Sequence, residues 1–133
     1  MKLLKTGIVS GLVILLSLSI GPLAAAEDYG PLTVQQTEAG KVLADPEGMT
    51  VYTFDKDEPG KSNCTGQCAE AWPPVTAEED AEPTGALTII SRDDGSKQWA
   101  YEDQPLYTFV QDQEPGDVEG DGFKDIWHVV EVE

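Results

Sequence analysis

The sequence has few basic residues and a single histidine. Eight Lys and Arg stand against 25 Asp and Glu, and the formal net charge is −17 at pH 7. No basic patch is present to bind phosphates, so nucleic acid is excluded as a partner. Such a surface repels anionic membranes and attracts cations and basic partners.

The sequence also lacks the usual signatures of catalysis. Only His128 could serve as an imidazole base, and no serine lies in a G-x-S-x-G elbow. No Gly-rich phosphate loop opens a helix. We therefore expect that the protein is not an enzyme and has no resident cofactor.

The first residues have the pattern of a secretory signal peptide. Basic residues up to Lys5 precede an apolar run from Ile8 to Ile20, and three alanines end at Ala26. The apolar run is shorter than the ~20 residues of a membrane span, which disfavours a membrane anchor. No cysteine near the cleavage site provides a lipid anchor. We expect a signal peptide at 1–26 and a periplasmic or secreted protein that does not insert into the membrane.

The expected mature chain, residues 27–133, is 107 residues long and suits a single domain. Without Lys2 and Lys5 the net charge of −17 becomes −19. Its two cysteines, Cys64 and Cys68, predict a disulfide in an exported protein. The closed loop is short, so the bond would stabilise the fold by only about 2 kcal/mol. A redox or metal pair is the alternative, although the usual redox spacing is C-x-x-C.

One motif occurs twice, 55 residues apart. Tyr52, Thr53 and Phe54 precede Asp57, and the same pattern begins at Tyr107. The alignment runs without gaps from residue 32 to 57, and a one-residue insertion later in the second copy is lost again before the tryptophan. This periodicity predicts a duplicated unit, with copies at about 31–76 and 86–133, sharing one core.

Within each copy the pattern is that of β-structure. Apolar and β-branched runs are separated by turn signals such as Asp94-Gly95. The sequence predicts an all-β domain: two pseudo-symmetric three-stranded meanders forming a small barrel or sandwich, with Trp72, Trp127 and the paired Tyr and Phe in the core. One short helix is expected at 66–71. The strands include 32–36, 49–54, 87–90, 97–101, 106–110 and 126–132.

The repeated motif permits two interpretations. Its residues are Tyr52, Phe54, Asp57, Tyr107, Phe109 and Asp112. Alternation places each Tyr and Phe on one face of a strand, and each Asp stands where a turn offers backbone N–H groups. The rings either form a symmetric core with capped turns or line a cleft for a cationic or sugar-like ligand. Two acids could also act as a glycosidase pair, but matching turns give them no reason to converge.

A metal site is the other candidate. Residues 117–125 carry acids at positions 1, 3, 5 and 9 with a glycine at position 6, like the front of a calcium loop. The twelfth position is His128 rather than the required Glu. Met49 and His128 with carboxylates could instead bind copper. The calcium candidates are Asp117, Glu119, Asp121, Asp125 and His128.

The order of these motifs resembles a known family. Y-x-aromatic-x-x-D is followed by Pro59-Gly60, the Cys64-x-x-x-Cys68 pair and Ala71-Trp72-Pro73-Pro74, and the second copy has Pro115-Gly116 and Trp127. This arrangement is similar to the bacterial secreted-repeat proteins described as "predicted lipoprotein with Yx(FWY)xxD motif". Many members have a lipid-anchor cysteine that is missing here. The resemblance implies export and a duplicated β unit, and no activity.

Three functions remain open at this point. The first is a non-enzymatic exported binding module for an unknown exported protein or cationic ligand. The second is a calcium- or copper-binding protein. The third, and least favoured, is a hydrolase that uses Asp57 and Asp112.

Overall fold

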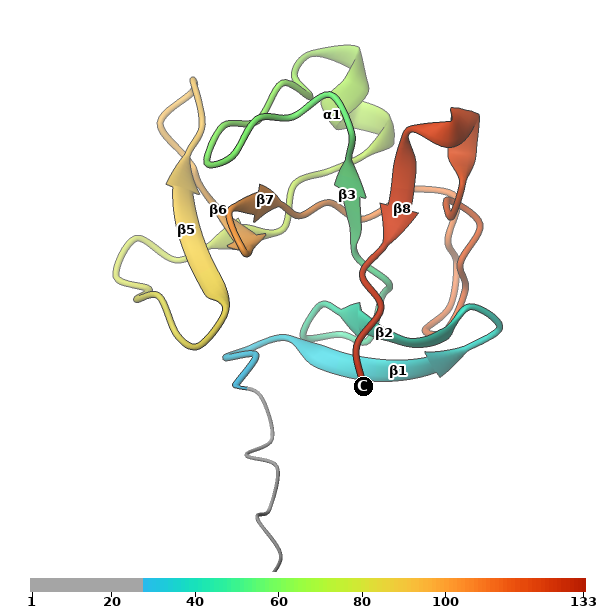
Figure 1. The fold of residues 1–133 in the computed structure, drawn as a ribbon. Helices are drawn as coiled ribbons and strands as arrows, with labels where there is room; N and C mark the ends of the chain where they lie inside the picture. The colour runs from blue at the N-terminus through green and yellow to red at the C-terminus, as the bar shows by residue number, and fades with distance from the viewer. Residues whose placement is uncertain (1–27) are drawn as a thin grey trace, which may run out of the picture.

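The computed structural model describes residues 28–133, and the expected signal peptide at 1–26 lies outside the described residues. The described chain is built mainly of short strands and has one short α-helix, as predicted (Figure 1). The elements are β1 (Thr33–Thr37), β2 (Gly40–Ala44), β3 (Tyr52–Phe54), α1 (Gln67–Ala71), β4 (Thr76–Ala77), β5 (Leu87–Ser91), β6 (Lys97–Tyr101), β7 (Gln104–Pro105), the 3₁₀-helix η1 (Phe123–Asp125) and β8 (Trp127–Val129).

The strands form three small antiparallel sheets. β1 pairs with β2, β3 pairs with β8, and β6 lies between β4 and β5 and also pairs with β7. Over the described residues these sheets do not close into a barrel. Of the two architectures expected, the sandwich-like one is observed.

The third strand of each expected meander is different in the structure. β3 pairs with β8 of the other copy, and only an isolated bridge from Ala44 to Thr50 joins its segment to β2. Residues 106–110 form no strand at all. Their N–H groups bond to three different segments, at Trp99, at Tyr52 and at Ala71 and Pro73, so no continuous ladder forms. In the second copy the third strand is instead the short β7, which pairs with β6 and completes the meander β5–β6–β7. In the first copy the third strand, β3, pairs with β8 in place of β2.

The two copies are interlocked by their last residues. The N–H of Leu43 donates to Val130 O at 2.9 Å, and the N–H of Trp99 donates to Val75 O at 2.8 Å. The end of the first copy thus joins β6, and the end of the second copy joins β2. Each copy completes the sheet of the other.

These matching bonds also correct the alignment of the copies. Thr33 pairs with Ala44 in the first hairpin, whereas Thr88 pairs with Ala100 in the second. The second hairpin therefore contains one additional residue, and the turn after it one fewer. Leu43 corresponds to Trp99, at a separation of 56, so the gapless alignment predicted from residue 32 to 57 was wrong in this strand.

Two buried clusters form the core, and both follow the duplication. The first consists of four equivalent pairs: Leu32 and Leu87, Leu43 and Trp99, Val51 and Leu106, and Val75 and Val130. The second contains Tyr52, Cys64, Trp72, Tyr107, Phe109 and Trp127. Burial of each such side chain contributes roughly 1.5–3 kcal/mol, so both clusters stabilise the contact between the copies.

The second cluster contains a stack of four aromatic rings. The stacked ring centroids are 4.1 Å apart for Phe54 and Trp127, 3.8 Å for Trp127 and Trp72, and 3.9 Å for Trp72 and Phe109. The edge of Tyr52 contacts Trp72, and each outer Phe is stacked on the Trp of the other copy. Pairs of this kind contribute about 0.5–1.5 kcal/mol beyond their buried area.

The stack explains why residue 120 is glycine. A Cβ at Gly120 would lie 2.6 Å from Trp72 Cη2 and 3.0 Å from Phe109 Cδ2. We expect Gly120→Ala to lower the free energy of unfolding by about 2 kcal/mol, because the stacked rings must move. Urea unfolding measures the loss, and near-UV circular dichroism should report the disturbed tryptophans.

Gly122→Ala is the matched control. Its Cβ would meet no atom within 4 Å, and only its positive φ of 77° opposes the substitution. We expect a cost of about 1 kcal/mol with an unchanged near-UV spectrum. If Gly120→Ala lowered the free energy of unfolding no more than Gly122→Ala and also left the near-UV spectrum unchanged, the stack would not constrain this position.

Candidate functional site

The tyrosine and aspartate of the repeated motif bond across the two copies. Tyr52 Oη donates to Asp112 Oδ2 at 2.7 Å, and Tyr107 Oη donates to Asp57 Oδ2 at 2.6 Å. The two tyrosines also exchange backbone hydrogen bonds, of 2.7 and 3.0 Å. The pseudo-two-fold axis therefore passes between Tyr52 and Tyr107.

Each aspartate also caps the turn of its own copy. Asp57 Oδ1 accepts the N–H of Asn63 at 2.6 Å, and Asp112 Oδ1 accepts the N–H of Glu119 at 2.8 Å. This is the turn-capping role expected from their position near Pro-Gly. Nothing in the sequence indicates that the second oxygen of each carboxylate reaches the other copy.

Burial shifts the protonation equilibria of these four groups. It raises the pKa of Asp57 and of Asp112, and the tyrosine hydrogen bonds oppose the shift only in part. Burial, reinforced by the neighbouring carboxylate, raises the pKa of Tyr52 and Tyr107 well above that of a free phenol. Both phenols are thus protonated donors, and both carboxylates are occupied acceptors.

The motif residues are packed in the core and do not line a cleft. Tyr52 and Tyr107 are 0% exposed, and Phe109 is 4% exposed. Phe54 is half-buried against Trp127. The aromatic cleft considered from the sequence is not observed at these residues.

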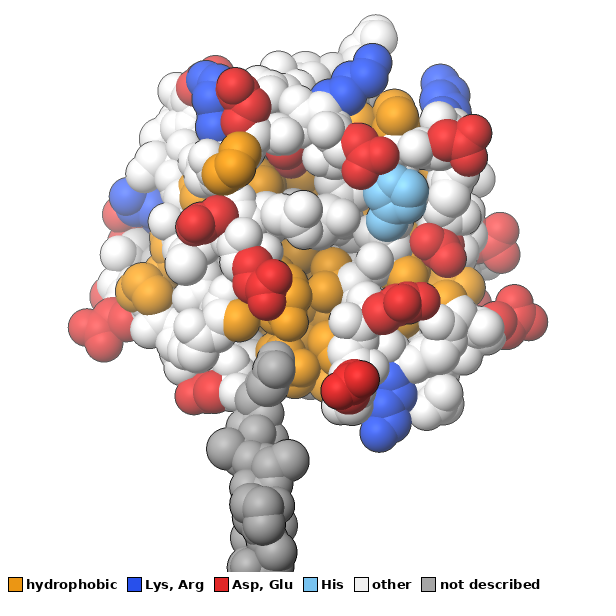
Figure 2. All heavy atoms as spheres, in the orientation of Figure 1, with side chains coloured by type: hydrophobic (Ala, Val, Ile, Leu, Met, Phe, Trp, Pro, Cys, Tyr) orange, Lys and Arg blue, Asp and Glu red, His pale blue; other side chains and the backbone are white. Residues whose placement is uncertain are grey.

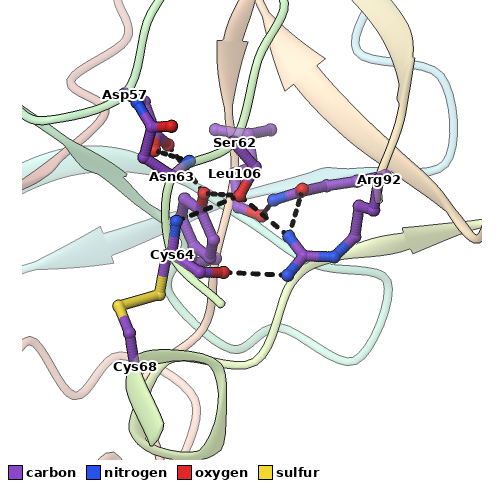
Figure 3. Close-up of a disulfide and its surroundings, with 9 residues drawn as sticks. Asp57, Ser62, Asn63, Cys64, Cys68, Arg92 and Leu106 are labelled. Carbon is purple, nitrogen blue, oxygen red and sulfur yellow. Dashed lines mark hydrogen bonds between the residues drawn. A yellow bond between two sulfur atoms is a disulfide. The ribbon is translucent and has the colours of Figure 1, made fainter. Parts of the chain in front are cut away.

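An arginine links the cysteine loop to the second hairpin (Figure 3). Arg92 Nη1 donates to Ser62 Oγ at 3.0 Å and to Gln98 Oε1 at 2.8 Å, while Nη2 donates to Cys64 O at 2.8 Å. Ser62 Oγ in turn lies 2.6 Å from Tyr107 Oη. The cysteine loop of the first copy thus contacts Tyr107 through Ser62, and Arg92 of the second copy holds Ser62 in place.

The equivalent place in the second copy is simpler. Gly120 N donates to Tyr52 Oη at 3.2 Å, without an intervening side chain. Sequence reasoning missed the Arg92 network. The available signal was Gln98, a polar residue in a predicted strand, which is fully buried and donates to Leu106 O at 2.7 Å.

The disulfide between Cys64 and Cys68 is formed, as predicted. Cys64 is fully buried in the aromatic cluster, and Cys68 lies in α1. The bond therefore fastens the short helix to the ring stack. Cys64 corresponds to Gly120 of the second copy, because each directly follows the residue whose N–H is bound by the motif aspartate of its own copy.

The calcium candidates take other roles in the structure. Asp117 Oδ2 accepts the N–H groups of Gln113 and Glu114, and Asp121 Oδ1 accepts that of Val129. Within residues 28–133, no three His, Cys, Asp or Glu side chains gather in a way that could hold a metal ion. The structure does not bring together the set Asp117, Glu119, Asp121, Asp125 and His128.

His128, the residue shared by both metal hypotheses, lies on the surface. Its Nε2 is 2.9 Å from Asp55 Oδ2, and the two side chains are 43% and 52% exposed. Met49 is half-buried, and its N–H donates to Asp45 Oδ1. Neither of these contacts brings His128 and Met49 together at one metal site.

A family model described as a secreted repeat of unknown function matches residues 33–76 and 88–131. The chain belongs to this family. The two matched segments of this secreted repeat protein begin 55 residues apart, in agreement with the two copies, and the resemblance seen in the sequence is confirmed. No curated protein and no solved structure is significantly similar to it. Among its described residues, no helix has the length and apolarity to cross a membrane.

The reciprocal bonds predict a loss of stability at alkaline pH. Unfolded tyrosines ionise near their ordinary pKa of 10.0, whereas Tyr52 and Tyr107 keep their protons when folded. The unfolded state then binds fewer protons, so stability is complete below about pH 10 and falls as pH rises above it, by up to about 1.4 kcal/mol per pH unit for each tyrosine. Urea unfolding between pH 8 and 11.5 measures this slope.

Tyr52→Phe tests the assignment. At pH 7 it should lower the free energy of unfolding by about 2 kcal/mol, because buried Asp112 loses a donor. Above pH 10 its slope should be shallower than that of the parent chain. An unchanged slope would mean that Tyr52 is not the titrating group.

Proposed function

We propose that this secreted repeat protein is a non-enzymatic binding module that recognises a basic exported protein or another cationic ligand. One observation carries the proposal: the polar groups of the repeated motif are buried and bonded to one another. Each phenol donates to a carboxylate of the other copy. The motif thereby stabilises the fold, and a partner would be recognised by the loops and the surface.

The charge of the chain indicates the kind of partner. Acidic residues outnumber basic ones by 25 to 8. Figure 2 shows acidic side chains over the whole face drawn there, with basic ones more widely separated. Such a surface attracts cationic partners over roughly a Debye length, about 8 Å at physiological salt.

The two alternatives have less support. Asp57 and Asp112 are each engaged by a tyrosine and a backbone N–H, which leaves neither free as a nucleophile or acid for a hydrolase. Calcium or copper binding would require the acidic loop and His128 to rearrange. Calorimetric titration of calcium, zinc and copper decides this alternative: binding heat would favour it, and no heat for any of the three would remove it.

Capture from the exported fraction tests the main proposal. The chain from residue 27, immobilised through its C-terminus, should retain a basic protein at moderate salt and release it as salt is raised, because screening weakens the attraction. An unrelated acidic domain of equal charge is the control. Recovery of nothing, or of the same proteins on both supports, would contradict a specific protein partner.

A further inference from the structure

A pocket of 280 Å³ lies beside the linker that joins the two copies, apart from the tyrosine–aspartate pairs. Trp99, only 5% exposed, forms its buried part. Its other lining includes the apolar residues Pro31, Pro46 and Ala81 and the exposed acids Glu78 and Asp80. We call this the linker pocket.

The pocket is held in place by the sheet beneath it. Trp99 N donates to Val75 O at 2.8 Å, and β4 pairs with β6, so the linker begins directly beside the indole. A turn closed by Ala81 N and Glu78 O at 3.0 Å then returns Ala81 to the first core cluster. Both acids therefore belong to a short, anchored turn.

The indole marks a place where the copies differ. The equivalent core position in the first copy is Leu43, which is fully buried. An aliphatic side chain was thus sufficient for packing there, whereas the second copy has an aromatic ring in contact with the pocket. An indole face attracts cations, an interaction that leucine cannot provide.

The lining defines the chemistry of a ligand. Two carboxylates flank an indole and several apolar side chains, and no Lys or Arg lines the pocket. Its volume lies just below the ~300–1,000 Å³ of typical ligand sites, which limits the ligand to a small molecule or a single side chain. We propose that the linker pocket binds a small organic cation, an ammonium group with a short apolar body. This inference rests on the proposed function, since it names the class of cationic ligand.

Choline provides a direct test, because 3,3-dimethylbutan-1-ol has nearly the same shape without the charge. In ¹H–¹⁵N spectra of the chain from residue 27, choline should shift the indole N–H signal of Trp99 and leave those of the other two tryptophans in place. Trp99→Phe assigns the signal. The neutral alcohol should bind at least roughly fivefold more weakly, because it gains neither carboxylate nor cation–π attraction.

Two double variants separate the pocket acids from the general charge. Glu78→Gln with Asp80→Asn should weaken choline binding roughly fivefold. Glu79→Gln with Glu82→Gln removes the same charge from the same linker at residues outside the pocket lining, and should leave binding almost unchanged. An equal loss in both double variants would overturn the proposal.

A second ligand distinguishes the source of the ammonium group. Stronger binding of choline than of a blocked lysine peptide indicates a free small cation, and the reverse indicates a lysine side chain of a protein. If neither shifts the Trp99 signal, the pocket proposal is wrong even where basic proteins are captured. If choline binds but no basic protein is captured, only the protein-partner form of the proposed function fails.

Discussion

The structure depends on one reciprocal interaction, the hydrogen bond from the tyrosine of each copy to the aspartate of the other. It joins a buried donor to a buried acceptor that also caps a turn. A buried polar group that lost its partner would lower the free energy of unfolding by about 1–3 kcal/mol. Each copy therefore needs the other in order to fold. The aromatic stack lies next to these bonds and excludes water from them.

Much of the fold can be predicted from the sequence, because large aromatic residues recur at equivalent positions and reveal the duplication. Trp72 and Trp127 predicted a shared core, and the two cysteines predicted the disulfide. The carboxylates were also correctly expected to cap turns. These inferences needed only local patterns, such as a Pro-Gly turn or an alternating strand.

The errors arose where a choice depended on contacts between distant segments. Tyr52 has the same spacing to Asp57 as Tyr107 has to Asp112, so the sequence could not reveal that each bonds to the other copy's acid. Residues 106–110 look like a strand, but their backbone groups bond to three separate segments. The extra residue of the second hairpin was hidden because two glycines, Gly40 and Gly95, align without it. Arg92 reaches the cysteine loop through two hydrogen bonds, to Ser62 and Cys64, which lie about 30 residues away in the sequence.

The crossing of the last strands has a consequence for how such a fold can be assembled. Because each copy closes the sheet of its neighbour, a chain with a single copy would leave a sheet edge, a tyrosine hydroxyl and a tryptophan face without partners. Two identical chains of that kind would satisfy all three by pairing around a two-fold axis. The present chain therefore has the geometry of a symmetric dimer contained in one polypeptide. Because both halves belong to one polypeptide, their sequences need not be identical. Their outer loops can therefore diverge while the buried centre remains the same.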